Sequence, residues 1–439
     1  MRVGYCSPFN PMKSGISDFS EELVGALANK AEVVVFSPVE LSNKSVTDHC
    51  ETHRLSKLDD AQIRNSLDVI VYHVGNNLAC HEEILNMYFK YPGVLELHDV
   101  GLHYLAAEKA TKSQDWEAYR RLAKYCHGTK GANIVDAFLR GESGAPWENH
   151  PIDMAMSREI VEKAQAVIVH SEYAKQMVLG VRDDVPVACI MLHSVQEELR
   201  PDEIKKMCRD KLGLNSDTVI FGCFGFATKP KRIIQTLEAI SRYKDLGNQE
   251  FTFLIVGEAD KNLRLDERIK KLQLEKNIKT TGYTKLEDFS RYMGVCDFCL
   301  NLRYPTQGES SGSLHRMLGM GKPVIVTDIG TFADYPDDVV IKVRHDEHEV
   351  DDIFRAICKL ADNKRERTAR GERARRYAEE HCNIEKNAKR YAEFFEQVVN
   401  HTWQPDYEDT LIGHLCELNL TEEKYLEHIC AECIIHGFE

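Results

Sequence analysis

A short polar turn between two apolar runs is the clearest candidate for chemistry. Residues 298–302 are apolar, and after a polar loop Glu309-Ser310-Ser311-Gly312-Ser313 opens a helical stretch that ends at Gly321-Lys322-Pro323. The first N–H groups of a helix lack intrahelical partners, and the helix dipole favours negative charge there. Because serine and glycine let an anion approach closely, the turn predicts a diphosphate site. A serine that only caps the helix is the alternative.

A turn rich in cations is the second candidate. The apolar run 219–225 ends at Gly225, and Lys229, Lys231 and Arg232 follow within a few residues. Cations gathered before a helix N-terminus are electrostatically unfavourable unless an anion joins them. This pattern also predicts a phosphate ligand.

Other strand ends carry further candidates. Leu97-His98-Asp99 suits sugar hydroxyls or a developing charge, although such a pair can also cap a helix. Gly15 follows the first apolar run, where it forms either a phosphate-binding helix start or a structural turn. Val256-Gly257-Glu258 and Gly282-Tyr283-Thr284 end two more runs, at positions where a base and a ribose usually lie.

Alternating strands and helices must position these residues. Continuous apolar runs separated by amphipathic stretches predict parallel sheets that are covered on both faces, and hence two doubly wound α/β domains facing a cleft. The predicted strands are residues 3–6, 32–37, 69–74, 94–98, 166–170 and 187–192, then 219–225, 251–257, 278–283, 298–302, 324–327 and 339–343.

The predicted domains are residues 1–197, on the acceptor side, and 198–400, on the donor side, whose last helices could return to the first domain. Residues 103–140 predict a charged helical excursion, either a solvated face or a contact with an anionic membrane. Residues 401–439 form an acidic extension with a net charge of −8.

The extension contains a set of soft ligands, His428, Cys430, Cys433 and His436. These positions do not share one helix face, so we favour an amphipathic helix over residues 424–435 to a zinc site. Such a helix would dock on a domain or on a second subunit and make a homo-oligomer.

Composition excludes several classes of protein. The 439 residues are 43% hydrophobic and 29% charged, and no apolar run approaches the roughly 18 residues of a membrane span. A net charge of −14 argues against nucleic-acid binding. The N-terminal residues resemble a strand rather than a signal peptide. Most of the fourteen cysteines stand singly inside apolar runs, which indicates a reducing compartment rather than a disulfide framework. We therefore expect a cytoplasmic protein, which is either free in the cytoplasm or associated with a membrane.

In its order of motifs the chain resembles the retaining nucleotide-sugar glycosyltransferases of family 4, which have the GT-B fold. The resemblance covers about residues 1–400 and rests on the Gly15 turn, His98-Asp99, Ser171-Glu172-Tyr173, Gly225 with Lys231, the Glu309 turn, and Gly321-Lys322-Pro323-Val324-Ile325. It implies that a sugar passes from a nucleoside diphosphate, UDP or GDP, to a hydroxyl of a glycan, a lipid-linked acceptor or a small molecule. It implies no cofactor and no metal.

The resemblance also implies roles for single residues. His98, Lys231 and Glu309 would be catalytic, with His98 at the donor sugar and Lys231 at the diphosphate. The phosphates and the nucleotide would be bound by Gly15, Arg232, Arg303, Ser310, Ser311, Gly312, Ser313, Gly225, Gly257, Glu258 and Tyr283. Acceptor contacts would come from Asp99, His103 and His127.

Two departures from the family pattern leave alternatives open. Phe226 stands where the family commonly has an arginine, so Arg232 or Arg303 would supply that charge, and Arg316 replaces the second glutamate of the usual pair. A catalytically impaired sugar-nucleotide-binding scaffold and a nucleotide-sugar epimerase are the alternatives. A dinucleotide dehydrogenase is disfavoured because Ser7-Pro8-Phe9, and no Gly-x-Gly-x-x-Gly turn, follows the first strand.

Overall fold

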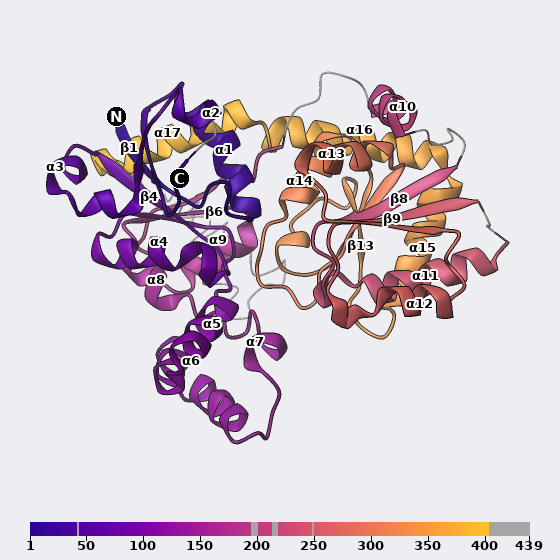
Figure 1. The fold of residues 1–439 in the computed structure, drawn as a ribbon, viewed down its shortest axis with the longest axis horizontal. Coiled ribbons are helices and arrows are strands. Elements are labelled where there is room, and N and C mark those ends of the chain that lie inside the picture. Colours follow the sequence, from indigo (N-terminus) through magenta and orange to yellow (C-terminus); the bar gives the residue numbers. More distant parts are fainter. Residues whose placement is uncertain (42–43, 195–200, 213–217, 248–249, 404–439) are drawn as a thin grey trace, which may run out of the picture.

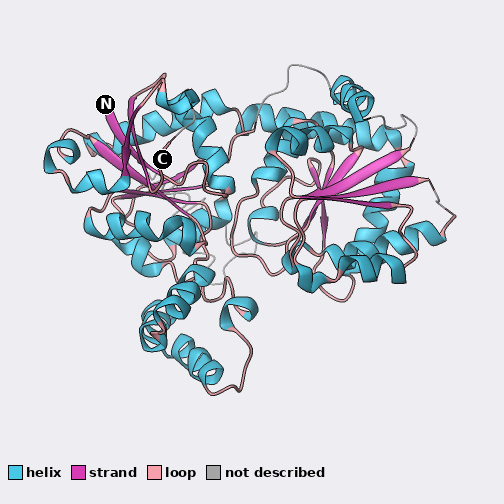
Figure 2. Ribbon diagram, viewed as in Figure 1, coloured by secondary structure: helices cyan, strands magenta, loops and turns pink. Residues whose placement is uncertain are grey.

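Two parallel sheets form the centres of the two halves of the chain (Figure 1). The structure is a computed structural model that describes residues 1–41, 44–194, 201–212, 218–247 and 250–403. In Figure 2 the helices surround both sheets, so each half is a layered α/β domain. The predicted fold class is confirmed.

The first sheet has the strand order β3-β2-β1-β4-β5-β6-β7. Its strands are β1 (Arg2–Cys6), β2 (Glu32–Ser37), β3 (Glu51–Arg54), β4 (Val69–Val74), β5 (Val94–Leu97), β6 (Ala166–Val169) and β7 (Val187–Cys189). Its helices are α1 (Gly15–Leu27), α2 (Lys44–Thr47), α3 (Ala61–Arg64), α4 (Leu78–Lys90), α5 (His103–Ser113), α6 (Trp116–Leu139), α7 (Pro146–Asn149), α8 (Arg158–Lys163) and α9 (Glu172–Leu179). The apolar side chains of the strands build a core on each face of the sheet.

The second sheet has the order β10-β9-β8-β11-β12-β13. Its strands are β8 (Val219–Phe224), β9 (Phe251–Val256), β10 (Ile278–Gly282), β11 (Phe298–Asn301), β12 (Val324–Thr327) and β13 (Val340–Val343). The helices that follow the first domain are α10 (Pro201–Leu212), α11 (Ile233–Asp245), α12 (Leu265–Lys271), α13 (Leu286–Val295), α14 (Gly312–Gly319), α15 (Glu349–Asp362), α16 (Lys364–His381) and α17 (Ile384–Asn400). Two cores again cover the two faces.

The predicted helical excursion consists of α5 and α6, which project from the first domain together with α7 (Figure 1). The backbone of α6 breaks at His127 and at Gly128, where φ is +61°. Trp116, Tyr119 and Trp147 pack against one another, so the excursion has an aromatic core of its own.

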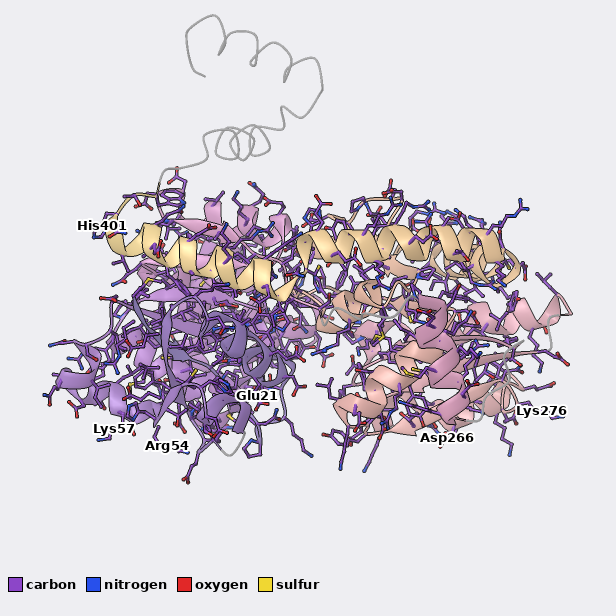
Figure 3. All side chains as sticks on the ribbon, turned by 90° about the horizontal axis from the view of Figure 1, so that it is seen from above. Glu21, Arg54, Lys57, Asp266, Lys276 and His401 are labelled. Atoms are coloured by element: carbon purple, nitrogen blue, oxygen red, sulfur yellow. The ribbon has the colours of Figure 1, made fainter. Side chains whose placement is uncertain are left out.

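The last helix crosses back to the first domain. Figure 3 shows α16 and α17 running across both domains, with His401 at the far end of α17. Asn383 separates the two helices and caps α17, because its side chain accepts the N–H of Lys386 at 3.0 Å. Tyr391 and Phe395 of α17 are buried in the core beside β1, so residues late in the sequence complete the first domain.

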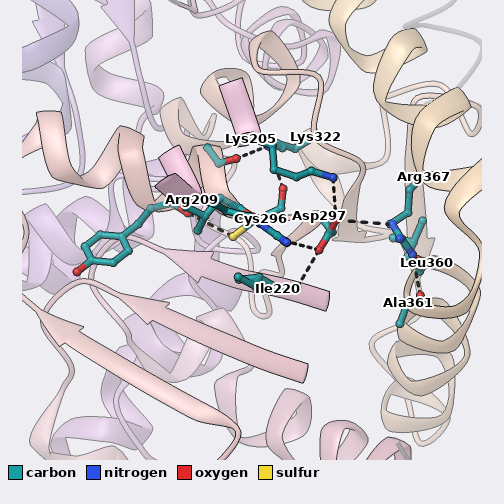
Figure 4. A network of polar contacts seen from close by, with 12 residues as sticks. Lys205, Arg209, Ile220, Cys296, Asp297, Lys322, Leu360, Ala361 and Arg367 are labelled. Atoms are coloured by element: carbon teal, nitrogen blue, oxygen red, sulfur yellow. Dashed lines mark hydrogen bonds and ion pairs between the residues drawn. The ribbon is translucent and has the colours of Figure 1, made fainter. Parts of the chain in front are cut away.

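A buried carboxylate ties α10 and α16 to the second sheet (Figure 4). Asp297 accepts hydrogen bonds from Arg209 at 2.8 Å and from Lys205 at 3.3 Å, and Arg367 lies 4.0 Å away. Nearby, the buried Lys322 donates to the backbone carbonyls of residues 294 and 296. This network is structural, and Lys322 of the Gly-Lys-Pro turn faces it rather than the cleft.

Part of the sequence interpretation lies outside the described residues. The boundary predicted at residue 197 and the metal-ligand motif of the acidic extension both fall there. None of the described helices combines the length and the apolar character that a membrane-spanning segment requires.

Candidate active site

A cavity of about 900 Å³ lies between the two domains. Loops that follow β1, β4 and β5 form one wall, and loops that follow β8, β9, β10 and β11 form the other. The sequence-predicted residues that line it are Gly15, His98, Asp99, Gly225, Gly257, Glu258, Tyr283, Ser310, Gly312 and Ser313. The fold thus gathers, in one cavity, residues that are spread over 300 positions of the chain.

Two helices begin at this cavity, one from each domain. Ser14 caps α1 by accepting the N–H of Ile16 at 3.2 Å, and Gly15 follows it at the cavity wall. Ser311 caps α14 by accepting the N–H of Leu314 at 3.3 Å. The predicted cap and the predicted anion turn therefore coexist, because Ser311 is buried as the cap while Ser310, Gly312 and Ser313 line the cavity.

Glycines bring the ends of β8 and β9 close together. Gly225 has a φ of +86° and Gly257 a φ of +134°, conformations that residues with a side chain rarely adopt. A Cβ at Gly257 would lie 2.5 Å from the carbonyl oxygen of Gly225, and a Cβ at Gly225 would lie 2.6 Å from Lys231 Nζ. The lysine amine therefore sits directly behind the glycine that forms the cavity wall.

Lys231 belongs to a cluster of two cations and one carboxylate. Its Nζ donates to the carbonyl of Phe224 at 2.5 Å, and burial, reinforced by the charge of Arg303, holds its pKa well below the usual value. Arg303 Nε lies 3.3 Å from Glu309 Oε1. The carboxylate of Glu309 also accepts from Thr306 and from the N–H of Gln307, so it is turned into its own loop and does not line the cavity. Among the residues that the structure describes, Arg303 thus pairs with Glu309, whereas Lys231 forms no ion pair.

Arg232 lies elsewhere. Its guanidinium forms an ion pair with the buried Glu349, with Nε 2.7 Å from Oε1, and it is not part of the cavity lining. Arg303 does not line the cavity either, so neither arginine takes the place that Phe226 leaves. Two aromatic residues, Phe226 and Tyr283, line the cavity instead. Phe226 is 53% exposed and Tyr283 is 66% exposed.

The His-Asp pair at the end of β5 meets the serine turn across the cleft. Residues Asp99 and Glu309 form an isolated antiparallel bridge. Burial raises the pKa of Asp99 to about 7, although the N–H of Asn76 donates to its carboxylate at 2.8 Å. Asn76 also donates to Gln307 of the second domain at 2.9 Å. These contacts hold the two predicted halves of the site together.

The other two predicted acceptor residues lie in the helical excursion. His103 Nε2 is 2.6 Å from the hydroxyl of Tyr119, and His127 accepts the N–H of Met156 at 3.3 Å. Neither residue lines the cavity. Their predicted contact with the cavity is not observed, because the buried His103 side chain bonds to Tyr119 and to the carbonyl of His150, and His127 bonds to Met156.

An ion pair across the cleft is a feature that the sequence interpretation missed. Arg316 of α14 donates to both carboxylate oxygens of Glu22 of α1, at 2.7 and 2.9 Å, and His193 lies 2.9 Å from the same carboxylate. Burial raises the pKa of Glu22, but the hydrogen bond from His193 and the charge of Arg316 together lower it below the ordinary value. The spacing of Asp18 and Glu22, four residues apart on one helix face, was the available signal.

A buried group of polar side chains below His98 was missed as well. His73, Glu96 and His170 are each no more than 1% exposed and surround His98. Each interrupts or directly follows an apolar strand, and this interruption was the signal in the sequence.

Comparisons with known proteins agree with this geometry. Residues 205–377 match the family model described as glycosyl transferases group 1. A curated relative, an uncharacterized glycosyltransferase of Methanocaldococcus jannaschii, is 26% identical over 262 residues, which are 56% of this chain. The match spans 62% of the length of that relative.

Solved structures share the architecture of both domains. Sucrose-phosphate synthase from Thermosynechococcus elongatus is 15% identical, with a TM-score of 0.64 over 91% of this chain and 100% of that chain. HepE from Anabaena, in complex with UDP-glucose, is 14% identical, with a TM-score of 0.61 over 90% and 100%. WaaG, a glycosyltransferase involved in lipopolysaccharide biosynthesis, is 14% identical, with a TM-score of 0.59 over 90% and 99%. The predicted resemblance to nucleotide-sugar glycosyltransferases is therefore confirmed: the described domains have the GT-B fold, and residues 205–377 match the group 1 glycosyl transferases.

Proposed function

We propose that this protein is an enzyme, a glycosyltransferase that moves a sugar from a nucleoside-diphosphate sugar to a hydroxyl acceptor with retention of configuration. The observation that carries the proposal is the arrangement of two helix N-termini and the Lys231 amine around one interdomain cavity. Unpaired N–H groups at a cleft, with a cation directly behind its wall, favour an anionic group such as a diphosphate.

The donor is proposed to lie along the second domain. Its diphosphate would contact the N–H groups at the start of α14 and Lys231, while Tyr283 and Phe226 offer aromatic faces to the base. A UDP-sugar is the first donor to test, because the similarly folded HepE was solved in complex with UDP-glucose. GDP-sugars are the second.

The chemistry follows from charge. Breaking the anomeric C–O bond leaves negative charge on the diphosphate, which Lys231 and the α14 N–H groups would stabilise more strongly as the bond breaks. These groups belong to the chain itself, so the proposal includes neither a cofactor nor a metal at the diphosphate. His98, which is 7% exposed at the opposite wall, would contact the sugar.

Retention is proposed to arise from attack on the face that the leaving group vacates. Three of the four cavity carboxylates already accept hydrogen bonds, Glu22 from Arg316, Asp99 from the N–H of Asn76, and Asp18 from Asn10, and the fourth, Glu258, lies in the second domain, where the base is proposed. We therefore assign no covalent nucleophile. The departing phosphate would accept the proton of the acceptor hydroxyl. A role in cell-surface glycan or glycoconjugate synthesis, in the cytoplasm or at a membrane surface, is part of this proposal.

A catalytically impaired scaffold is the second candidate, because Arg316 is held by Glu22 rather than free for a ligand. The test is to incubate the full chain with UDP- and GDP-sugars, with and without glycan and simple alcohol acceptors, and to measure nucleotide release and product anomer. Donor turnover with a retained anomeric configuration is expected. Donor binding by thermal shift without turnover for any acceptor would favour the scaffold, and an inverted product would refute retention.

A further inference from the structure

Three neighbouring strands of the first domain place four polar side chains on one face of the sheet. His73 of β4 pairs with Glu96 of β5, and Glu96 pairs with Ile168 of β6. Side chains alternate along a strand, so His98 and His170, two residues further on, point to the same face as these pairs. Phe19 of α1 and Tyr391 of α17 cover this face.

The ligand atoms of His73, Glu96 and His98 converge, since all of them lie within 4.8 Å of one another, and His170 lies beside them. Glu96 Oε1 lies 3.7 Å from His98 Nε2 and 3.5 Å from His170 Nε2, and His73 Nδ1 lies 3.0 Å from His98 Nε2. Two ligand atoms, each about 2.1 Å from a metal ion, are about 3.0 Å apart at a right angle and about 3.4 Å apart at the tetrahedral angle. The observed spacings are therefore those of a metal site.

Hydrogen bonds around the cluster leave a lone pair pointing inwards. His170 Nδ1 lies 2.7 Å from the carbonyl oxygen of Ile190, so this nitrogen carries the ring proton. In the neutral imidazole His170 Nε2 is then unprotonated, and it is buried without a hydrogen-bond partner in the direction of Glu96. A lone pair facing a carboxylate oxygen is unfavourable unless a proton or a metal ion lies between them.

Two other buried atoms of the cluster also lack partners, His73 Nε2 and Glu96 Oε2, which lie 3.4 Å from each other. A neutral His73 with its proton on Nε2 would keep Nδ1 free as a ligand. Tyr391 donates to the other carboxylate oxygen, Oε1, at 2.7 Å. Ligands whose remaining polar atoms are held by such hydrogen bonds are typical of metal centres.

We propose that His73, Glu96 and His98 bind one divalent transition-metal ion of the zinc type, beside the buried His170. The ion takes the place of the proton that would otherwise link His73 Nδ1 and His98 Nε2. Two imidazoles and one carboxylate suit zinc, manganese and iron(II).

The ion has a positioning role. Because His98 both lines the cavity and reaches the cluster through its Nε2 atom, the bound ion fixes the orientation of the imidazole at the proposed sugar site. It lies in the first domain, whereas Lys231 and the α14 turn belong to the second, so it does not take part in binding the diphosphate. The metal site thus goes beyond the proposed function and can be tested without it.

The test measures the metal content of the full chain, purified without metal-affinity resin, by mass spectrometry. Because the extension carries soft ligands of its own, the variant C430S/C433S is analysed in parallel. We expect about one ion per chain in the wild type and in this variant, and a loss of at least tenfold in E96Q and in H73Q. H103Q is the matched control, since His103 is a buried histidine that bonds to Tyr119 outside the cluster, and it should keep the ion.

A second measurement needs no variant in the cluster. After removal of metal with a chelator, zinc, manganese or iron(II) should each be added to C430S/C433S, and at least one should raise its Tm, because an ion that binds only the folded state stabilises it. The proposal is overturned if no ion is present and none of the three raises the Tm, since protons alone then link the cluster. It is also overturned if E96Q keeps the ion and C430S/C433S loses it.

Discussion

Two adjacent cations, Lys231 and Arg232, should respond in opposite ways to neutral substitution. Lys231 lies behind Gly225 at the cavity wall and donates only to a backbone carbonyl among the hydrogen bonds of the described residues, whereas Arg232 is paired with the buried Glu349. In Lys231→Met the aliphatic part of the side chain is kept and the charge is lost. In Arg232→Met a buried carboxylate loses its partner.

The size of the Lys231 effect follows from Coulomb's law. A unit charge about 4 Å from a phosphate charge, at an effective dielectric constant of about 20, contributes about 4 kcal/mol. At about 1.4 kcal/mol per tenfold change, the full loss would lower kcat/KM about a thousandfold, and partial compensation by the α14 N–H groups would leave about a hundredfold. The fold should tolerate the change, because no ion pair within the described ranges joins Lys231 to a carboxylate, and burial disfavours its charge until an anion binds.

The assay compares donor turnover and Tm for both variants with the wild type. Lys231→Met should lose about a hundredfold or more in kcat/KM with a Tm change below about 4 °C. Arg232→Met should keep its kcat/KM while losing about 3 kcal/mol of stability, a fall in Tm of about 10 °C. Turnover of Lys231→Met within threefold of the wild type would refute the placement of the diphosphate.

Two further substitutions test the cavity wall and the contact between domains. Gly257→Ala should destabilise the protein by about 1–3 kcal/mol in urea unfolding, because the new Cβ would lie 2.5 Å from a backbone oxygen and φ is +134°; an unchanged midpoint would contradict this geometry. Arg316→Ala should lower the stability of the protein at neutral pH and reduce its loss in acid. The lowered pKa of Glu22 contributes stability above the unfolded value of about 4.3, and this stability is lost as the pH falls through the folded value. Urea midpoints at pH 7 and pH 4 should therefore differ less in the variant than in the wild type, and an equal difference would show that this ion pair is not the cause.

The strands were predictable from the sequence because both faces of each sheet are buried. Each predicted apolar run contains a strand of the structure. Within the described ranges, β3 is the strand that the pattern did not predict, since its sequence Glu-Thr-His-Arg is polar and it lies at the edge of the sheet with exposed or half-buried side chains. An edge strand whose side chains stay in contact with solvent can consist of polar residues, so an apolar pattern does not reveal it.

The site was predictable only where a single short segment carried the signal. The serine turn and Gly225 with Lys231 combine residues that are close in sequence, and the fold brings both segments to the cavity. The pair of Glu22 and Arg316 joins residues from two domains, so the spacing of Asp18 and Glu22 on one helix could point to an acidic face but not to the arginine that meets it. His103 was predicted at the site because it follows Asp99 closely in the sequence. Spacing along the chain does not show that its side chain turns instead toward Tyr119 of the helical excursion.

The return of α17 to the first domain bears on how the chain folds during synthesis. The core beside β1 and α1 also contains three aromatic residues of α17, Tyr391, Phe394 and Phe395. These residues are synthesised nearly 400 positions after β1. A ribosome that has released only the first half of the chain therefore leaves that apolar surface open until the end of translation. The second domain can complete its sheet first, and the earlier domain should mature last, so chaperone dependence should be greatest for nascent chains that stop before α17.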